Sequence, residues 1–394
     1  MSSLKGMRVL DLTQHLSGPY CTMLLGDMGA DVVKIEKLDD GDDQRKLGPF
    51  INGESFPFMM INRNKRSFRL NLKSEVGKQV LYKLAKNADV FVENFRPGIV
   101  KSLGIDYETI CEINPGIIYC SISGYGQTGP ESHKGGFDIM SQGIAGTMSM
   151  NSEEGKRPVK IPISIHDLSA SVTALYSILS AYIYKLNNRV GQYIDVALVD
   201  SGLGLTVQEA SGYFGAGAIP KVSGTRNRLA APYQAYRCKD GYVIVGAGNQ
   251  RLWERLCRDV VNKPDWIGDP RFGSVSDRVA HIDELEVLME DVLLEHDKQY
   301  WVQKMDSAGV PGGPINTYDQ ALSDPHILAR EMVREIEHPV AGKIKTLGFP
   351  AKMSLTPGEI RTPSPIFGQH TDEILRELNF QDDEIADLKK SKVI

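Results

Sequence analysis

The sequence predicts an α/β protein in which a Rossmann-like, doubly wound parallel sheet forms a large domain and a smaller α+β domain follows. Strand-like and helix-like runs alternate along the first third of the chain, as they do where helices join parallel strands. With 394 residues the chain is too long for one simple core, so two domains are expected. A stretch rich in Gly, Pro and Ala interrupts the alternation at 212–232.

The elements of the large domain follow from apolar periodicity and from helix-end signals. Strands are predicted at residues 8–12, 31–36, 89–95 and 117–123, and helices at 18–30, 73–88, 106–113, 168–186 and 195–209. Pro19 lies in the first turn of the first helix, where a missing N–H is tolerated, and glycine follows the last turn. Leu168, Val172 and Leu175 recur at helical spacing and predict the buried face of a helix.

The domain boundaries follow the change in composition. Residues 1–210 are predicted to form the first part of the large domain, 211–232 a linker, 233–325 the small domain, and 326–394 a segment that returns to the large domain. The small domain contains a hairpin-like run, YQAYRCKDGYVIVGAG, and several helix-like runs.

Composition excludes several classes of function. Hydrophobic content of 41% and charged content of 24% are ordinary for a globular enzyme, and a net charge of −5 argues against a nucleic-acid binder. The five cysteines form no C-x-x-C pair and the eight histidines no H-x-x-x-H pair, so neither disulfides nor a metal site are expected. The N-terminus shows no signal-peptide pattern and no apolar stretch has membrane-spanning length, which predicts a cytoplasmic protein without a membrane partner.

Two common motifs are missing from the sequence. The turn after the first strand reads TQHLSGPY, without the G-x-G-x-x-G of dinucleotide enzymes. The chain also lacks the G-x-S-x-G elbow of α/β-hydrolases. A nicotinamide dehydrogenase and a simple serine hydrolase are therefore disfavoured.

A single carboxylate, Asp167, stands in IPISIHDLSAS where a strand-like run meets a helix-like run. It has two interpretations: an N-cap for the helix, or a catalytic carboxylate. The neighbouring residue is His166, but adjacent residues of an extended segment point in opposite directions, so a His–Asp dyad is not expected.

Three further stretches are candidate binding segments. NRNKRSFRLNLK (62–73) carries five basic residues and no acid, which suits either a polyphosphate site or a solvated loop. VENFRPG (92–98) ends a strand and offers an amide, an aromatic face and a guanidinium fork, although Pro-Gly alone would also enforce a turn there. GAGNQ (246–250) is a glycine-rich loop that suits either a ligand lid or a hairpin turn.

Together these segments resemble the class III CoA-transferases of the CaiB/BaiF type, the family of formyl-CoA transferase and of the carnitine and bile-acid CoA-transferases. The resemblance rests on VLDLTQHLSGPYCTMLLGDMGADVVKIE, NRNKRSFRLNLK, VENFRPG, SGYGQTGP, GGFDIMSQGIAG, GQYIDVALVD and FGQHTDEIL, and it covers nearly the whole chain. It implies an interlocked-ring homodimer that acts on acyl-CoA and small carboxylic acids without a tightly bound cofactor.

The resemblance also implies site residues. Asp167 would be the catalytic carboxylate, and Gly246 and Gly248 would bring backbone N–H groups of a lid towards the reacting carbonyl oxygens. Coenzyme A would lie against Leu16, Ser17, Lys37, Leu70 to Lys73, Asn94, Phe95, Arg96, Lys101 and Asp138. Ser102 stands where family members often carry an arginine. Arg45 or Arg226 would hold the second carboxylate of a small dicarboxylate such as succinate or oxalate.

The implied chemistry passes through an aspartyl mixed anhydride and an aspartyl-CoA thioester. An ordinary aspartate pKa of about 3.9 and a nearby helix N-terminus would keep Asp167 ionised at pH 7, so the expected difficulty is exclusion of water.

Two rival functions remain. An acyl-CoA racemase of the same superfamily resembles G-H-D-I-N-Y where this chain reads GGFDIMS, so that Phe137 replaces the catalytic histidine and cannot transfer a proton. A non-catalytic CoA-binding protein would have no use for Asp167.

Overall fold

The computed structural model describes residues 2–394, and these form two compact units. The large unit comprises residues up to Met148, Lys160–Ile219 and His326–Ile394, and the small unit comprises Ser149–Val159 and Pro220–Pro325. Both units are therefore assembled from separate stretches of chain.

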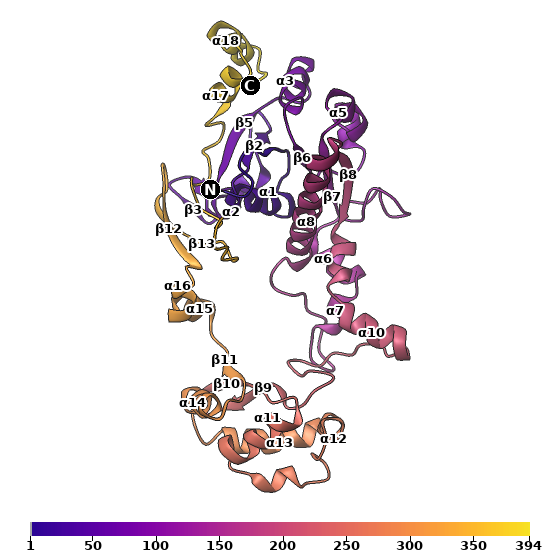
Figure 1. Cartoon of the computed structure of the whole chain (residues 1–394), viewed down its shortest axis with the longest axis vertical. Helices are drawn as coiled ribbons and strands as arrows, with labels where there is room; N and C mark the ends of the chain where they lie inside the picture. The colour runs from indigo at the N-terminus through magenta and orange to yellow at the C-terminus, as the bar shows by residue number, and fades with distance from the viewer. Residues whose placement is uncertain (1) are drawn as a thin grey trace. The chain divides into compact units, whose positions relative to one another are not determined.

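The large unit is built on a six-stranded sheet with the order β5-β2-β1-β6-β7-β8, in which all neighbours run parallel (Figure 1). The strands are β1 (Arg8–Asp11), β2 (Asp31–Glu36), β5 (Lys65–Arg69), β6 (Val90–Glu93), β7 (Ile118–Ser123) and β8 (Gln192–Ala197). The predicted strands at 8–12, 31–36, 89–95 and 117–123 are confirmed as β1, β2, β6 and β7.

Helices and short elements complete the large unit. They are α1 (Ser17–Asp27), η1 (Asp43–Lys46), β3 (Phe50–Ile51), β4 (Glu54–Ser55), α2 (Phe56–Ile61), α3 (Glu75–Ala85), α4 (Ile99–Leu103), α5 (Tyr107–Ile113), α6 (Asp138–Ile144), α8 (Ile165–Asn188), α9 (Leu198–Gly204), α10 (Val207–Ala216), β12 (Val333–His338), β13 (Gly342–Leu347), α17 (Thr371–Glu377) and α18 (Asp382–Lys390). Helices α7 (Thr147–Met150) and α16 (Pro325–Ala329) lie at the unit boundaries.

The sheet is covered on both faces, as the doubly wound class requires. Neighbouring residues of β1 point to opposite faces, so Leu10 joins one core and Val9 the other. The core on the Leu10 side also takes in residues of α3, α5, α17 and α18. The core on the Val9 side takes in α1 and α8, where Ala174 and Ile178 of α8 are fully buried.

Two expectations about local structure are wrong. The predicted helix at 195–209 begins instead as strand β8, which pairs in parallel with β7 from Gln192 to Ala197. The run Tyr-Ile-Asp-Val carries the β-branched and aromatic residues that suit a strand, and pairing with β7 decides the outcome. Part of the predicted linker is helix α10, which ends at Gly217 in the left-handed region, at φ 66°.

The small unit contains the predicted hairpin. Strands β9 (Tyr233–Cys238) and β10 (Gly241–Gly246) are antiparallel, and β11 (Gly312–Pro314) pairs with β10. Its helices are α11 (Gln250–Arg255), η2 (Leu256–Val260), η3 (Pro264–Ile267), α12 (Val275–Ala280), α13 (Ile282–Leu293), α14 (Lys298–Ala308) and α15 (Tyr318–Ser323). They enclose a core of their own around Trp253 and Phe272.

Within residues 2–394, none of the helices combines the length and the apolar character that crossing a bilayer requires.

Candidate active site

Two cavities of the large unit gather most of the predicted site residues. The Lys73 cavity, of about 510 Å³, is lined by residues around the ends of β1, β2, β5 and β6. The Asp167 cavity, of about 390 Å³, is lined by residues near the ends of β1, β6 and β7 and the start of α8. Gln14 and Phe95 line both cavities, so the two share a wall. This is the carboxyl edge of the parallel sheet, where doubly wound folds bind their ligands.

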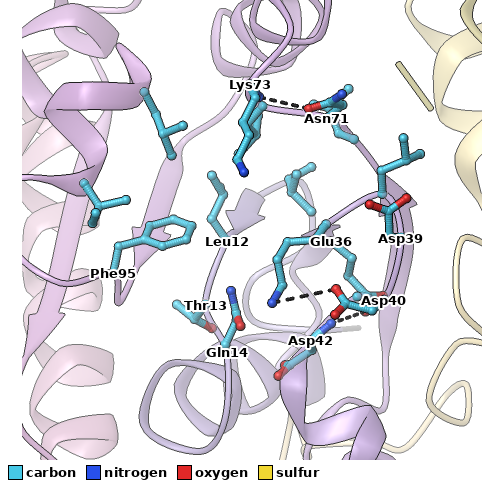
Figure 2. Close-up of a pocket in the computed structure, with 18 of the residues that line it drawn as sticks. Leu12, Thr13, Gln14, Glu36, Asp39, Asp40, Asp42, Asn71, Lys73 and Phe95 are labelled. Atoms are coloured by element: carbon cyan, nitrogen blue, oxygen red, sulfur yellow. Dashed lines mark hydrogen bonds and ion pairs between the residues drawn. The ribbon is translucent and has the colours of Figure 1, made fainter. Parts of the chain in front are cut away.

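The predicted residues divide between the two cavities. Lys37, Leu70, Lys73 and Phe95 line the Lys73 cavity, and Figure 2 shows Lys73 and Phe95 directed into it from different segments. Ser17, Asn94, Phe95, Arg96 and Asp167 line the Asp167 cavity.

Other predicted residues lie outside both linings. Leu16 is the N-cap residue of α1, next to Ser17. Lys101 is exposed on α4, while its neighbour Ser102 lines the Lys73 cavity. Asp138 is buried at the start of α6.

The interpretation of the basic run as a polyphosphate site is wrong for four of its five cations, and three of these four pair with acids. Arg63 is buried and pairs with Asp27 at 2.7 Å between Nη2 and Oδ2. Lys65 is buried and pairs with Asp11 at 2.8 Å. Arg66 pairs at the surface with one acid of β2 and two acids of α17: Asp31, Glu373 and Glu377.

The last two cations of the run differ from these. Arg69 packs its guanidinium over the Phe367 ring and donates to the Leu38 carbonyl. Lys73 has no ion pair within the described part of the chain, and it alone of the five lines the Lys73 cavity. The run therefore contributes one cation to the cavity, and its other members hold the return segment and the strands together.

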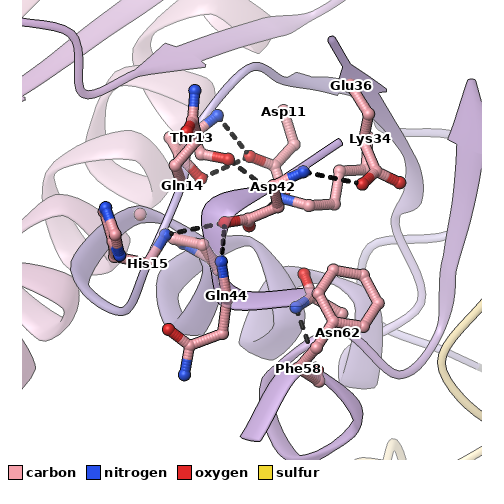
Figure 3. Close-up of polar contacts among 12 residues, drawn as sticks. Asp11, Thr13, Gln14, His15, Lys34, Glu36, Asp42, Gln44, Phe58 and Asn62 are labelled. Carbon is pink, nitrogen blue, oxygen red and sulfur yellow. Dashed lines mark hydrogen bonds and ion pairs between the residues drawn. The ribbon is translucent and has the colours of Figure 1, made fainter. Parts of the chain in front are cut away.

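A buried ionic network underlies the loop between β1 and α1 (Figure 3). Lys34 lies between Asp42, at 2.9 Å, and the Thr13 carbonyl, at 2.8 Å. Burial lowers the pKa of Lys65 to about 8 despite its contact with Asp11. Burial acts to raise the pKa of Asp11, but the ammonium groups of Lys34 and Lys65 prevail and hold it below its ordinary value. These opposite charges compensate one another and fix the loop that lines both cavities.

The Asn94 amide holds this loop from the other side. Its Oδ1 accepts from the Gln14 backbone N–H, and its Nδ2 donates to the Gln14 carbonyl, both at 2.8 Å. Both ends of the amide are therefore committed to protein backbone, and only the remaining surface of Asn94 faces the cavity. The preceding residue, Glu93, accepts from the Phe95 N–H at 2.8 Å, and burial raises its pKa to about 7.

Asp167 is not the cap of its helix. The N-cap of α8 is Ser164, and Asp167 is the third residue of the helix. Its carboxylate accepts no hydrogen bond and forms no ion pair with any residue of 2–394, while burial and then the Asp138 carboxylate raise its pKa to about 7. The expectation of full ionisation at pH 7 is therefore wrong, because burial outweighs the helix N-terminus.

The His166 side chain packs in the protein interior and does not line the Asp167 cavity. Its ring is fully buried, with Nε2 at 3.3 Å from Thr147 Oγ1. A Cβ atom at Gly202 of α9 would lie 2.1 Å from the ring Nδ1, so only glycine fits there. Burial lowers the pKa of His166, which favours the neutral ring.

Both arginines considered for the second carboxylate already have acidic partners. Arg45 forms two hydrogen bonds with Glu36 and lies over the Phe58 ring. Arg226, in the small unit, pairs with Asp283 and Glu286. Neither supports the expectation. Sequence reasoning missed Lys134 as a lining residue of the Asp167 cavity, although it directly precedes the quoted GGFD motif, whose first residue, Gly135, also lines the cavity.

The predicted lid belongs to the small unit, and its role stays a prediction. Gly246 ends β10, and its N–H donates to the Pro311 carbonyl at 2.8 Å. A Cβ atom at Gly248 would lie 2.9 Å from Ala230 Cβ, which accounts for glycine at that position.

Comparison with known proteins identifies the family. The family model described as "CoA-transferase family III" matches residues 4–371. Succinyl-CoA:glutarate CoA-transferase of Mus musculus is 37% identical over 396 residues, with 100% of this chain and 91% of that protein covered. Acetyl-CoA:oxalate CoA-transferase of Acetobacter aceti is 35% identical, with 89% and 88% covered.

A solved structure agrees. The crystal structure of a CaiB/BaiF family protein from Brucella suis superposes with a TM-score of 0.85 at 34% identity, covering 96% of this chain and 99% of that one. This chain belongs to CoA-transferase family III and is a CoA-transferase.

Proposed function

We propose that this enzyme moves CoA from an acyl-CoA to a small dicarboxylate through covalent intermediates on Asp167. The observation that carries the proposal is the Asp167 carboxylate itself. It lines a cavity, it has no hydrogen-bonding partner in residues 2–394, and its pKa is raised to about 7. A poorly solvated, more basic carboxylate is a better nucleophile than an ordinary surface aspartate.

Four exchanges complete the reaction. The Asp167 carboxylate attacks the thioester carbonyl, the C–S bond breaks, and CoA thiolate leaves behind an aspartyl–acyl anhydride. The thiolate then attacks the aspartyl carbonyl and releases the donor carboxylate, which leaves an aspartyl-CoA thioester. The acceptor carboxylate attacks that thioester and frees the thiolate again. The thiolate finally attacks the acyl carbonyl of the new anhydride. This yields the new acyl-CoA and regenerates the Asp167 carboxylate.

The two cavities suit the two ends of CoA. Lys73 and Lys37 bring positive charge to the Lys73 cavity, where the phosphates of the nucleotide half would lie, and Leu70 and Phe95 offer apolar surface. The pantetheine arm would pass the shared wall at Phe95 and present its thioester to Asp167. Lys37 also contacts Asp40 and Asp43, so Lys73 is the stronger candidate for a phosphate contact.

The dicarboxylate acceptor rests on the relatives and on local charge. The names of the similar enzymes specify glutarate, oxalate and mesaconate. Arg96 lines the Asp167 cavity and is the candidate to hold a second carboxylate, whereas Lys134, which also lines it, pairs with Glu131. Arg96 packs against Gly135, where a Cβ atom would come within 3.1 Å of its Nε.

We also propose that two copies associate, as the resemblance to interlocked-ring enzymes implies. Large apolar side chains of α8 and α10 are exposed in the single chain, among them Tyr176 at 56%, Ile183 at 61% and Phe214 at 84%. Surfaces of this kind mark protein interfaces. Light scattering at nanomolar concentration should give twice the mass of the 394-residue chain, and a folded monomer would contradict the dimer.

The covalent route is tested by incubating the enzyme with succinyl-CoA alone. The enzyme should become sensitive to hydroxylamine, and mass spectrometry should place the modification on the peptide that contains Asp167. Addition of glutarate, oxalate or mesaconate should then restore the unmodified enzyme and produce a new acyl-CoA. Production of a new acyl-CoA with no modified peptide under any donor would refute the covalent route.

A further inference from the structure

Asp138, expected from the family resemblance to contact CoA, faces the protein interior instead. It is 7% exposed at the start of α6 and does not line either cavity. Its Oδ1 accepts from the backbone N–H of His166 at 2.9 Å, and its Oδ2 accepts from Gln142 Nε2 at 2.7 Å. Both carboxylate oxygens are thus bonded to protein groups.

Gln142 extends this connection to the segment before α8. Its side chain is fully buried, one turn after Asp138 on α6. Its Oε1 accepts from the Ile161 N–H at 2.8 Å, and its Nε2 makes a longer contact of 3.4 Å with the Ile161 carbonyl. Two side chains of one helix therefore hold both ends of the segment 161–166, which leads directly into Asp167.

We propose that Asp138 and Gln142 are positioning residues for acyl transfer at Asp167. The proposal rests on the nucleophilic role of Asp167 given above. The hydrogen bond to the His166 N–H fixes the first turn of α8, and neither Asp138 nor Asp167 forms an ion pair within residues 2–394.

The charged surroundings of Asp167 support this role. The Asp138 carboxylate on α6 is the charged group that contributes, after burial, to the raised pKa of Asp167. On α8 itself, burial lowers the pKa of His166, although the Asp138 carboxylate acts in the opposite direction. The other ionisable residues that line the cavity lie on its loops and on η1: His15, Asp43, Arg96 and Lys134. A neighbouring carboxylate makes Asp167 more basic, and a more basic carboxylate attacks a thioester more readily once it is ionised.

The test replaces the charge and keeps the shape. In Asp138→Asn, the side-chain oxygen can still accept from the His166 N–H, but the carboxylate is gone. The acid limb of kcat, measured across pH 5 to 9, should move to lower pH by several tenths of a unit, and kcat at high pH should fall severalfold. KM for acyl-CoA should stay within about twofold, because no CoA contact is lost. Burial also raises the pKa of Glu93 to about 7, so Glu93 can contribute to the acid limb of kcat. The change in the limb between wild type and Asp138→Asn is therefore diagnostic, and its absolute position is not.

A compensating variant separates charge from hydrogen bonding. Asp138→Asn alone leaves Gln142 Nε2 facing an amide. In Asp138→Asn with Gln142→Glu, the new amide donates to the new carboxylate, which still accepts from the Ile161 N–H, and only the longer contact to the Ile161 carbonyl is lost. This double variant should recover thermal stability towards wild type. Its acid limb should lie between those of the wild type and Asp138→Asn, because the charge returns one side chain further away.

Asp106→Asn serves as the matched control. Asp106 caps α5 by accepting from the Thr109 N–H, so the change also removes a charge from a helix start, but outside both cavities. It should leave the pH profile unchanged.

A rise in KM for acyl-CoA with an unmoved acid limb would overturn the proposal and return Asp138 to the CoA site. The coupling between residues 138 and 167 is also measurable without turnover. The pH dependence of unfolding should differ between wild type and Asp138→Asn, and that difference should be smaller in an Asp167→Asn background. A fully active Asp167→Asn enzyme would instead refute the nucleophile, and the unfolding coupling would still report on the positioning contact.

Discussion

Two groups of buried charges in the large unit contrast sharply. In the network beneath the β1–α1 loop, Asp11 lies between two ammonium groups, and its pKa is held below the ordinary value. At the starts of α6 and α8, neither Asp138 nor Asp167 forms an ion pair in residues 2–394, and burial and then the Asp138 carboxylate raise the pKa of Asp167. Within one domain, the pKa of one aspartate is thus lowered and the pKa of another is raised.

The difference separates charges that hold structure from a charge that can react. A compensated buried ion pair is costly to disturb and gains little by changing its protonation state. A carboxylate that lacks partners remains destabilised and available to form a bond. The Asp167 cavity is therefore lined by a loop that the compensated network holds, and its lining includes a carboxylate without a partner in residues 2–394.

The largest expected effect comes from removing the unsatisfied charge. Asp167→Asn keeps the shape but cannot form an anhydride, so turnover should fall on the order of a thousandfold or more. Steady-state CoA exchange measures the loss, and CoA affinity measured by calorimetry should change little because the amide retains the volume. Wild-type turnover in this variant would show that Asp167 is not the nucleophile.

Removing one member of the compensated network should affect folding rather than chemistry. Lys65→Met leaves Asp11 buried with a single ammonium partner, and stability should fall by roughly 3–5 kcal/mol, as for other broken buried pairs. Urea unfolding measures the change. Lys37→Met is the matched control: its ammonium pairs with Asp40 and Asp43 while 45% exposed, and the cost should stay below about 1 kcal/mol. Equal losses would mean that burial of the network is unimportant.

The contribution of Asp167 to folding stability should depend on pH. The folded pKa of Asp167, about 7, exceeds its ordinary value of 3.8, so the folded state binds a proton more tightly than the unfolded state. This group's contribution to stability therefore falls as pH rises from about 4 to 7 and stays low above that. Asp167→Asn should stabilise the fold by roughly 1–2 kcal/mol at pH 8 and hardly at pH 4, after allowance for solvent screening. A stability gain that is independent of pH would contradict the raised pKa.

The smallest expected effect comes from changing Lys73, the cation of the basic run 62–73 that lines the Lys73 cavity. Lys73→Ala should weaken CoA binding by roughly 1 kcal/mol, about fivefold in Kd, and the difference should shrink in high salt. Lys298→Ala, on α14 of the small unit, is the control and should leave Kd unchanged. Equal effects of the two changes at every salt concentration would remove Lys73 from the site.

The sequence predicted the parallel sheet well, because the apolar runs of buried strands and the apolar periodicity of amphipathic helices are visible within each segment. It misjudged the basic run for a physical reason. The carboxylates that neutralise Arg63 and Arg66 come from Asp27, Asp31 and α17, far outside the window that showed no acid. Long-range pairing cannot be read from local composition.

The candidate site was predictable in part for the same reason. Most residues that the resemblance named, Asp167 among them, line one of the two cavities, but the cap interpretation was wrong because α8 begins at Ile165, earlier than the apolar period indicated. The raised pKa of Asp167 depends first on burial and then on Asp138, which lies 29 positions earlier (167 − 138), and both arise only in the folded chain. The backbone bonds of Asn94 were likewise invisible before folding.

The double hydrogen bond between Asn94 and Gln14 has a consequence for the kinetics and entropy of ligand capture. It joins the end of β6 to the loop after β1, and Gln14 lies in the wall that the two cavities share. The wall is therefore ordered before any ligand arrives, and little conformational freedom is left to lose there on binding. We expect the nucleotide half of CoA to associate in one fast phase, with slower rearrangements confined to steps that follow its capture.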